Sequence, residues 1–274
     1  MSAFAVEIAD GIADVRLLGP GGDADRSNTM GTAFWDELPQ VFAAIDADAG
    51  VKAVVLTGSG PNFSLGLDLR EMLPRWAGVL DAGAQARPRT EFLTEIRRLQ
   101  QAVSSVARCR VPVIAAVSGW CVGGGVDLIA AADIRLASAD AKFSVREVKL
   151  AIVADLGSLH RLAGIIGEGH LRELALTGTD IGADRAERIG LLNHVYADAA
   201  ATIEAARALA AEIVANPPLA VEGTKQMLNA EREHRVAQGL REVASWNAAF
   251  LPSEDLSEAI AAFGERRPAR FTGR

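Results

Sequence analysis

Two stretches of sequence decide the fold, VVLTGSGPNFSLGLDL at residues 54–69 and VIAAVSGWCVGGGVDL at residues 113–128. Each begins with a short apolar run that is typical of a buried strand and continues through a glycine-rich turn into a helical pattern. In α/β proteins, ligands bind at the carboxyl ends of such strands. The sequence therefore predicts an α/β fold in which both turns face one site.

The segments around these stretches continue the alternation of strands and helices. The opening FAVEIADGIADVRL, residues 4–17, predicts a hairpin with its turn at Asp10-Gly11. Residues 74–90 lack periodicity and are expected to form a surface loop. Further elements are expected at residues 32–45 (helix), 92–106 (helix) and 133–138 (strand).

The strand pattern stops near residue 199, and only helical patterns follow. We therefore predict two parts, an α/β core with the site over residues 1–198 and a helical C-terminal region over residues 199–274. Helices are expected at residues 199–215, 219–233, 236–250 and 253–263, with breaks at Asn216-Pro217-Pro218 and Leu251-Pro252.

The composition limits the partners of this 274-residue chain, which carries a formal net charge of -7. An acidic total disfavours nucleic acid as a partner, although a cluster of arginines at residues 266–274 could meet a phosphate or form a solvated tail. Two cysteines without CxxC spacing predict neither a disulfide framework nor a metal site and fit a reducing cytoplasm. No secretory signal is expected, and the apolar run at residues 111–117 is too short to span a membrane.

Several enzyme classes lack their motifs here. The chain has no GxxxxGK[ST] or GxGxxG for a nucleotide, no GxSxG for a serine hydrolase and no HExxH for a zinc protease. The run Gly123-Gly124-Gly125 exposes peptide N–H groups where a helix is expected to begin, which favours an anion there. A tight turn with close packing explains a triple glycine equally well.

Three acids remain in otherwise apolar surroundings, Asp127, Glu147 and Asp155. Charged residues are seldom buried without a partner or a function. Burial and mutual repulsion would raise the pKa of at least one of them toward neutrality, as proton transfer at neutral pH requires. The alternative is that each acid caps a helix or pairs with a nearby arginine, for which the candidates are Arg135, Arg146 and Arg161.

Taken together, FSLGLDL (63–69), GGGVDL (123–128) and VREVKLAIVADLG (145–157) resemble the enoyl-CoA hydratase/isomerase (crotonase) superfamily. The resemblance covers nearly the whole chain, from RSNTM at residues 26–30 to FGERRPARFTG at residues 263–273. It implies a spiral of ββα turns with a helical C-terminal part that builds trimers, usually paired as hexamers. It also implies an acyl-CoA thioester as substrate and no separate cofactor, because coenzyme A is part of the substrate.

The resemblance assigns roles to individual residues. The N–H groups of Leu65 and Gly124 would form the oxyanion hole that binds the thioester oxygen, and residues 70–92 would shape the acyl pocket. Candidate linings of that pocket are Leu73, Trp76 and Leu80. The residues expected to contact the substrate or its coenzyme A part are Arg26, Ser64, Leu65, Gly66, Leu67, Asp68 and Gly123.

The acids distinguish the subgroup. Hydratases of the superfamily carry glutamate where this chain has Asp127, whereas Glu147 is retained and Asp155 is added. This trio, with RSNTMGTAFW at residues 26–35, is similar to the 3,5- to 2,4-dienoyl-CoA isomerases. Glu147 would then be the base beside the carbonyl and Asp155 the acid at the distal carbon, while Asp127 orients them or excludes water. The alternatives are an enoyl-CoA hydratase that adds water to 2-enoyl-CoA, a dehalogenase-like or decarboxylase member, and a non-catalytic protein that binds acyl-CoA.

Overall fold

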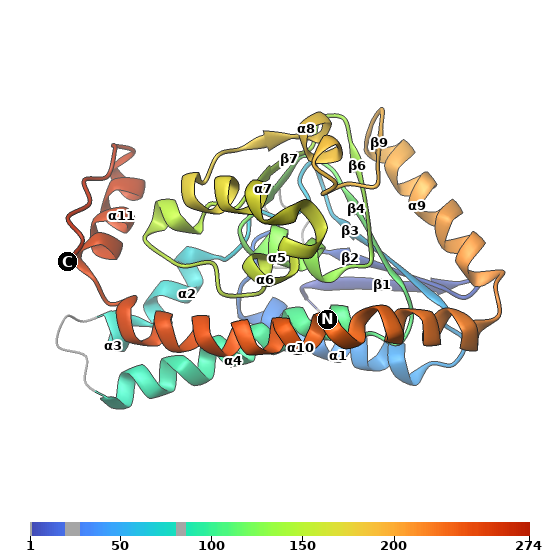
Figure 1. Cartoon of the computed structure of the whole chain (residues 1–274), viewed down its shortest axis with the longest axis horizontal. Coiled ribbons are helices and arrows are strands. Elements are labelled where there is room, and N and C mark those ends of the chain that lie inside the picture. The colour runs from blue at the N-terminus through green and yellow to red at the C-terminus, as the bar shows by residue number, and fades with distance from the viewer. Residues whose placement is uncertain (1, 20–27, 81–85) are drawn as a thin grey trace.

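A six-stranded sheet organises the chain, of which this computed structural model describes residues 2–19, 28–80 and 86–274 (Figure 1). Its strand order is β1-β2-β3-β4-β6-β9, with β1 antiparallel to β2 and every other neighbouring pair parallel. The expected hairpin turn at Asp10-Gly11 is confirmed, because both residues have positive φ angles. The strands are β1 (Phe4–Ala9), β2 (Ile12–Leu17), β3 (Ala53–Gly58), β4 (Val113–Val117), β6 (Ile134–Ser138) and β9 (His194–Tyr196).

A second, three-stranded sheet makes the chain a spiral. It consists of β5 (Trp120–Val122), β7 (Lys142–Ser144) and β8 (Ile181–Gly182). After β4 in the large sheet, the chain adds β5 to the small sheet, passes through α5 (Gly124–Ala131) and returns as β6. The predicted α/β spiral of ββα turns is therefore confirmed.

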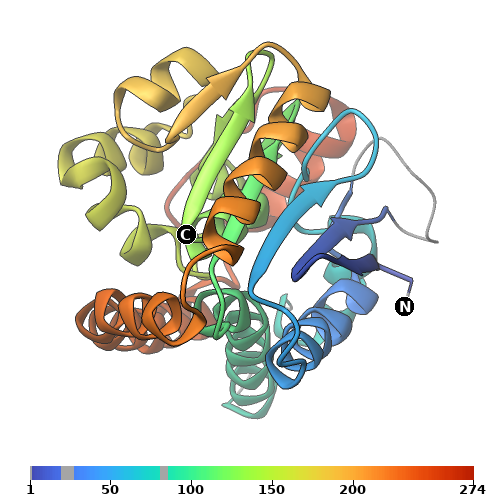
Figure 2. The ribbon, with the colours of Figure 1, turned by 90° about the vertical axis from the view of Figure 1, so that its right-hand side faces the viewer.

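Alternating side chains of the large sheet pack on its two faces. Val54 and Leu56 of β3 join the main core with α1 (Thr32–Ala47) and α4 (Ala86–Arg108). Their neighbour Val55 points the other way and packs against α9 (Ala199–Val214), which lies across the opposite face of the sheet (Figure 2). A helical layer thus covers each face, which explains why β3 and β4 are buried along almost their whole length and consist mainly of apolar residues.

The prediction of a loop over residues 74–90 is wrong for the residues of this range that the structure describes. Two short helices, α2 (Leu69–Arg75) and α3 (Ala77–Leu80), occupy its beginning, and α4 starts at Ala86. Asp68 caps the N-terminus of α2, because its side chain accepts hydrogen bonds from the N–H groups of Arg70 and Glu71. Because these helices are too short to show periodicity, capping and tertiary contacts determine them.

The helical C-terminal region is confirmed, with one difference. The two helices expected at residues 219–250 form a single helix, α10 (Pro218–Phe250), which packs along α4 (Figure 1). Ala244 and Ala248 of α10 belong to the main core, so residues 199–274 are not packed separately from the rest. No helix in the described ranges has the length and apolarity that crossing a membrane requires. The remaining helices are η1 (Glu147–Leu150), α6 (Ser158–Arg161), α7 (Ala163–Thr177), α8 (Ala183–Arg188) and α11 (Glu254–Glu265).

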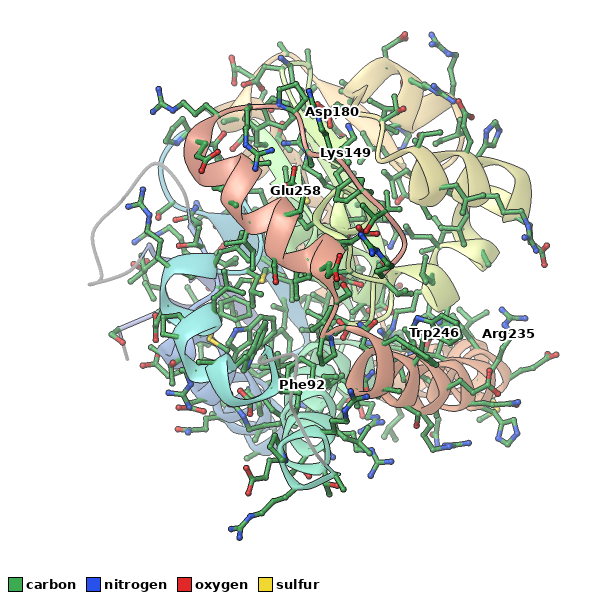
Figure 3. All side chains as sticks on the ribbon, turned by 90° about the vertical axis from the view of Figure 1, so that its left-hand side faces the viewer. Phe92, Lys149, Asp180, Arg235, Trp246 and Glu258 are labelled. Carbon is green, nitrogen blue, oxygen red and sulfur yellow. The ribbon has the colours of Figure 1, made fainter. Side chains whose placement is uncertain are left out.

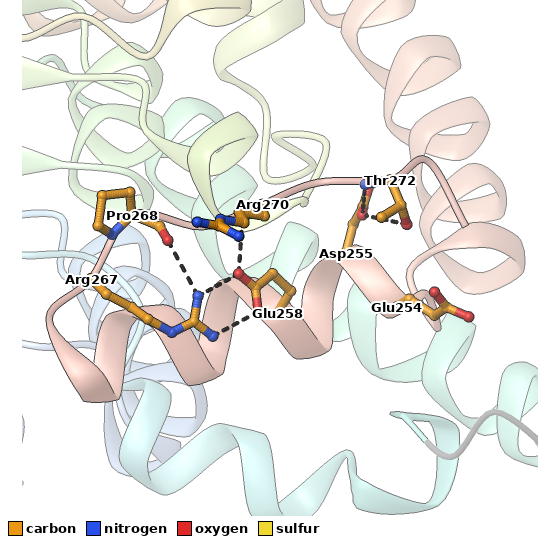
Figure 4. Close-up of a pocket in the computed structure, with 7 residues that line it drawn as sticks. All are labelled: Glu254, Asp255, Glu258, Arg267, Pro268, Arg270 and Thr272. Atoms are coloured by element: carbon orange, nitrogen blue, oxygen red, sulfur yellow. Dashed lines mark hydrogen bonds and ion pairs between the residues drawn. The ribbon is translucent and has the colours of Figure 1, made fainter.

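The C-terminal tail folds back onto α11 and encloses a polar surface pocket (Figure 4). Arg267 forms an ion pair with Glu258 at 2.6 Å, and the same carboxylate accepts the N–H of Arg270 at 2.8 Å. Asp255 accepts the N–H of Thr272 at 2.6 Å. The charge of Arg267 is therefore already balanced by acids of this chain.

Asn28 ties the turn after β3 to the segment before α1. Its amide donates to the carbonyl oxygens of Ser59 and Asn62, both at 2.7 Å, and its own oxygen accepts the Ser59 hydroxyl at 2.8 Å. Only 1% of Asn28 is exposed, so these groups would be buried without partners if the side chain were lost. The turn leads into residues 63–69, the first of the two glycine-rich segments on which the predicted site depends.

Replacing Asn28 with alanine should lower the free energy of unfolding by about 2–3 kcal/mol, because buried carbonyl groups lose their donors. Urea unfolding followed by circular dichroism measures the loss. Asn216→Ala is the matched control, since its amide is exposed and bonds only within its own turn, and it should change the value by less than about 0.5 kcal/mol. Equal losses in the two variants would contradict this role of Asn28.

Candidate active site

The two glycine-rich segments meet through a short parallel bridge between Ser64 and Cys121. The N–H of Ser64 donates to the Trp120 carbonyl at 3.0 Å, and the N–H of Val122 donates to the Ser64 carbonyl at 2.9 Å. Leu65 follows this bridge on one segment and Gly123 on the other. The expectation that both turns face one site is therefore confirmed.

Glycines let the two backbones approach each other closely. A Cβ atom on Gly66 would lie 2.7 Å from the Val122 carbonyl oxygen and 3.2 Å from the Gly124 nitrogen. Gly66 and Gly123 also have positive φ angles, +80° and +54°, which other residues rarely adopt. A side chain at Gly66 would thus push the segments apart.

The N–H groups of Leu65 and Gly124 have no acceptor among the described residues. Gly124 is the first residue of α5, where a helical N–H has no partner within the helix. Leu65 lies outside any element, and 39% of it is exposed. Two free donors on neighbouring segments can hold one oxygen that carries negative charge.

The three candidate acids come from α5, η1 and the loop before α6, and they lie around these donors. Asp127, in the first turn of α5, is 1% exposed. Glu147 begins η1, and its Oε1 is 3.4 Å from the point where a Cβ on Gly123 would lie. Asp155 precedes Leu156, whose side chain would touch a Cβ on Gly124 at 3.8 Å. The structure therefore brings together acids that are up to 28 positions apart in the sequence.

The arginines considered as partners of these acids bind elsewhere. Arg135 donates to main-chain carbonyl groups, and Arg146 pairs with Asp180 at 2.6 Å. The acid paired with Arg161 is Glu233, at 3.9 Å. Within the described residues, no ion pair involves any of the three candidate acids, and Oε2 of Glu147 is buried without a hydrogen-bond partner. Ion pairing therefore does not explain their burial.

Hydrogen bonds orient two of the acids. The N–H of Ser158 donates to Oδ1 of Asp127 at 2.5 Å, and the amide of Asn247 donates to Oδ2 of Asp155 at 2.8 Å. Gln100 holds the main chain at Asp155 by donating to its carbonyl at 2.8 Å. Asn247 and Gln100 were not identified in the sequence, because single polar residues in helices far along the chain carry no local signal.

Burial raises the pKa of all three carboxyl groups. The pKa of Asp127 is raised to about 6 by burial, against the Ser158 hydrogen bonds and the charge of Arg161, which lower it. Burial and then the charge of Asp127 raise the pKa of Glu147 to about 8. Burial also raises the pKa of Asp155 to about 7, although the Asn247 hydrogen bond lowers it. The site can therefore hold a carboxyl proton at neutral pH.

Other residues predicted for the site have structural partners. The Ser64 hydroxyl is buried, donates to the Asn28 carbonyl at 2.7 Å and accepts the Gly66 N–H at 3.1 Å. Asp68 caps α2 and accepts the Thr29 hydroxyl at 2.9 Å. Leu67 pairs with the segment before α1 and is half-buried. Arg26 lies outside the described residues, and so does the side chain of Leu80.

The acyl-pocket candidates in α2 and beside it pack into the core. Trp76 is 9% exposed and stacks edge-on against Phe92 with 5.2 Å between ring centroids, while Leu73 is half-buried. The indole N–H of Trp76 is buried and has no acceptor in the described part of the chain. Over the described ranges, no group of three or more His, Cys, Asp or Glu residues is arranged to hold a metal ion.

Comparison with known proteins identifies the family. The profile of the Enoyl-CoA hydratase/isomerase family matches residues 7–274. The chain belongs to this family.

Individual relatives of this enoyl-CoA hydratase/isomerase family member agree with that assignment. The chain is 43% identical to the mitochondrial Delta(3,5)-Delta(2,4)-dienoyl-CoA isomerase of Dictyostelium discoideum, over 89% of its own length and 83% of that protein. It is 40% identical to the peroxisomal Delta(3,5)-Delta(2,4)-dienoyl-CoA isomerase of Arabidopsis thaliana, with coverage of 89% and 88%. The crystal structure of an enoyl-CoA hydratase/isomerase from Mycobacterium paratuberculosis superimposes with a TM-score of 0.82 at 30% identity, covering 95% of this chain and 98% of that one.

Replacing Asp155 with asparagine should stabilise the protein more at pH 8 than at pH 4. The folded carboxyl keeps its proton up to a pKa of about 7, whereas the ordinary value is 3.8, so the native protein loses stability as pH rises through this window. A neutral amide avoids that loss, so the free energy of unfolding of the variant should exceed that of the unaltered protein by about 2–4 kcal/mol more at pH 8 than at pH 4. Urea unfolding at several pH values measures it.

The matched control for this measurement is Asp184→Asn, because the Asp184 side chain is 82% exposed. Its free energy of unfolding should not show the same gain between the two pH values. If Asp155→Asn gives equal stabilisation at pH 4 and pH 8, the raised pKa of Asp155 is contradicted.

Proposed function

We propose that this protein isomerises 3,5-dienoyl-CoA thioesters to 2,4-dienoyl-CoA thioesters. The observation that carries the proposal is a set of three acids beside two N–H groups that have no acceptor among the described residues. Asp127 is fully buried and the other two acids are partly buried, and within the described residues none of the three forms an ion pair. Two relatives with about 40% identity bear the name of this activity. Hydratases of the superfamily use glutamate at the position of Asp127, so simple addition of water is the less suitable reaction.

In this proposal the thioester oxygen accepts hydrogen bonds from the N–H groups of Leu65 and Gly124. The negative charge that develops on this oxygen is then stabilised by donors that need not reorient. Loss of one such donor typically costs roughly 3 kcal/mol of transition-state stabilisation. The pair therefore lowers the barrier for removing a proton beside the carbonyl.

Two further groups move the proton. The carboxylate of Glu147 takes a proton from C2, and the electron pair left behind spreads over the thioester oxygen and the conjugated chain as far as C6. Asp155 gives its proton to C6, which leaves double bonds at C2 and C4. One proton enters the protein and one leaves it, so no external reactant is consumed.

The raised pKa values suit this exchange. Glu147, with a pKa of about 8, is a stronger base when ionised than an ordinary glutamate. Asp155, with a pKa of about 7, can still carry a proton at neutral pH. In the empty site Glu147 has the higher pKa of the two, so the arrangement that the reaction needs, with Glu147 ionised and Asp155 protonated, is the less favoured one before substrate binds.

The remaining assignments follow the family resemblance. Asp127 orients the other acids or excludes a nucleophilic water, and its orientation is held by the N–H of Ser158. Coenzyme A enters as part of the substrate, with no further cofactor. It is proposed to lie along residues 64–68 and Gly123, with Arg26 near its phosphates.

Purified protein should convert 3,5-octadienoyl-CoA to 2,4-octadienoyl-CoA, and the growth of the ultraviolet band of this conjugated product measures the conversion. The protein should hydrate crotonyl-CoA only slowly. Asp155→Asn and Glu147→Gln should each lower kcat by roughly 10²–10⁴-fold, because each removes one proton-transfer group. Glu168→Gln is the control, since this carboxylate is exposed on α7, and it should keep full activity.

Fast hydration of crotonyl-CoA together with slow isomerisation would overturn the proposal in favour of a hydratase. Binding of both thioesters without turnover would point to a non-catalytic acyl-CoA-binding protein. Full activity in Asp155→Asn would show that this acid is structural.

We further propose that the chain assembles as a homotrimer or as a pair of trimers in a reducing cytoplasm. The assembly is supported by exposed apolar residues on α10, where Trp246 is 55% exposed and Phe250 is 60% exposed. Figure 3 shows Trp246 on this helix. The rings of Trp246 and Phe250 are in tilted contact, with 4.5 Å between centroids. Exposed aromatic pairs of this kind mark interaction sites between proteins.

Light scattering of the purified protein should give a mass of three or six chains. The double variant Trp246→Ser, Phe250→Ser should shift the mass toward the single chain, because it removes apolar area from the proposed contact. Leu176→Ser, at a residue of α7 that is 73% exposed, is the control and should leave the mass unchanged. A single-chain mass for the unaltered protein would contradict the assembly.

A further inference from the structure

Asn247 of α10 contacts the carboxyl group of Asp155 directly, although it comes from the helical C-terminal region. Its amide nitrogen donates to Oδ2 of Asp155 at 2.8 Å and to the Val153 carbonyl oxygen at 2.8 Å. Only 2% of Asn247 is exposed, so water has little access to its amide. Both N–H groups of this amide therefore have acceptors in the segment that carries the proposed distal acid.

The contact with Val153 determines which way the amide of Asn247 points. A main-chain carbonyl oxygen can only accept a hydrogen bond, so the group that faces it must be the NH2 group of Asn247 and not the amide oxygen. With this group held in place, its second N–H points at Oδ2 of Asp155. The amide keeps this orientation whether Asp155 is ionised or protonated, because the Val153 carbonyl does not titrate.

A second amide holds the main chain of the same segment. Gln100 of α4 is 5% exposed, and it donates to the Asp155 carbonyl at 2.8 Å and to the Leu240 carbonyl of α10 at 2.9 Å. Both of these bonds end on main-chain oxygens. Gln100 thus supports the position of the segment, whereas Asn247 also orients the carboxyl group of Asp155.

The two oxygens of this carboxyl group are therefore not equivalent. Oδ2 of Asp155 faces a donor and must accept, so the proton of the neutral carboxyl group lies on Oδ1. No other side chain in the described ranges donates to this carboxyl group. Asp155 is partly exposed and Asn247 is buried, so Oδ1 is the oxygen that a bound substrate can reach.

We propose that Asn247 is a positioning residue for the isomerisation, which places the proton of Asp155 on Oδ1, toward the distal carbon of the substrate. This inference rests on the proposed isomerase function. The proton passes from Oδ1 to C6, where the electron pair of the dienolate forms the new C–H bond, and the electron pair of the O–H bond stays on the carboxylate. Asn247 touches neither the substrate nor the moving proton. It excludes the arrangement in which the proton sits on the wrong oxygen.

Asn247→Leu removes both donors with little change in side-chain volume. It should lower kcat for 3,5-octadienoyl-CoA by roughly 10–100-fold, with little change in KM, because the acid is no longer oriented while the substrate keeps its contacts. Removal of the C2 proton by Glu147 does not involve Asn247 and should continue. In D2O, Glu147 can exchange this proton with solvent and return a deuteron to C2. Mass spectrometry of recovered substrate and product should therefore show that the ratio of C2 exchange to isomerisation rises by roughly 10–100-fold in the variant.

Four further variants make this ratio specific. Asp155→Asn lacks the distal acid and should raise the ratio as well. Asn247→Ser is too short to reach Oδ2 and should also raise it, without placing an apolar group beside the Val153 carbonyl. Asn229→Leu is the matched control, since its amide lies on the same helix and donates to the Ala107 carbonyl at 3.2 Å, and it should leave the ratio unchanged.

Gln100→Leu separates positioning of the carboxyl group from support of its segment. It removes a buried donor to the Asp155 main chain and should lower the free energy of unfolding, as Asn247→Leu does, but it should raise the exchange ratio much less. Equal ratios in Gln100→Leu and Asn247→Leu would overturn the proposal. So would equal losses of C2 exchange and isomerisation in both Asn247 variants.

A readout without substrate separates this inference from the proposed function. Loss of the Asn247 donor should raise the pKa of Asp155, because a donated hydrogen bond favours the ionised form. The charge of Asp127, which also raises the pKa of Asp155, is the same in the variant and in the unaltered protein. Infrared pH titration of the protonated-carboxyl band should show this shift in Asn247→Leu, and Asp155→Asn should remove the signal.

The two readouts together distinguish the two proposals. If the infrared shift is present but the protein neither exchanges the C2 proton nor isomerises dienoyl-CoA, only the proposed function is wrong. If the protein isomerises dienoyl-CoA and Asn247→Leu moves neither the exchange ratio nor the infrared titration, the role of Asn247 is wrong.

Discussion

The geometry of the site depends on one backbone interaction, the parallel bridge between Ser64 and Cys121. It joins two segments that leave neighbouring strands of the large sheet, so that Leu65 and Gly124 present free N–H groups side by side. Gly66 must lack a side chain for this contact to exist. The proposed oxyanion site is therefore a product of main-chain pairing between the two segments.

Around this bridge the protein holds three acids close together, one fully buried and two partly buried, an arrangement that ordinarily destabilises a fold. Ser158 and Asn247 each donate to one carboxyl group. These contacts satisfy only part of the cluster, because Oε2 of Glu147 has no hydrogen-bond partner among the residues that the structure describes. The incomplete compensation raises the pKa values, and raised pKa values are what proton transfer near neutral pH requires.

Much of the architecture could be predicted because its signals are local. The hairpin at Asp10-Gly11, the two strand-turn-helix segments and the helical C-terminal region were all recognisable from turn residues and apolar periodicity. The short helices α2 and α3 were not, since they are fixed by a cap at Asp68 and by packing. The single helix α10 was divided in the prediction because its apolar face is irregular along the segment that packs on α4.

By itself, the sequence determined the family and the candidate residues of the site, because the two glycine-rich segments and the three acids each lie in short motifs that resemble those of the family. Only the tertiary structure decided which groups act on those acids. It placed Asn247 against Asp155 across 92 positions, and it placed Gln100 against the main chain at Asp155. The physical reason is that pKa depends on burial and on charges in space, and both arise only when distant helices pack together.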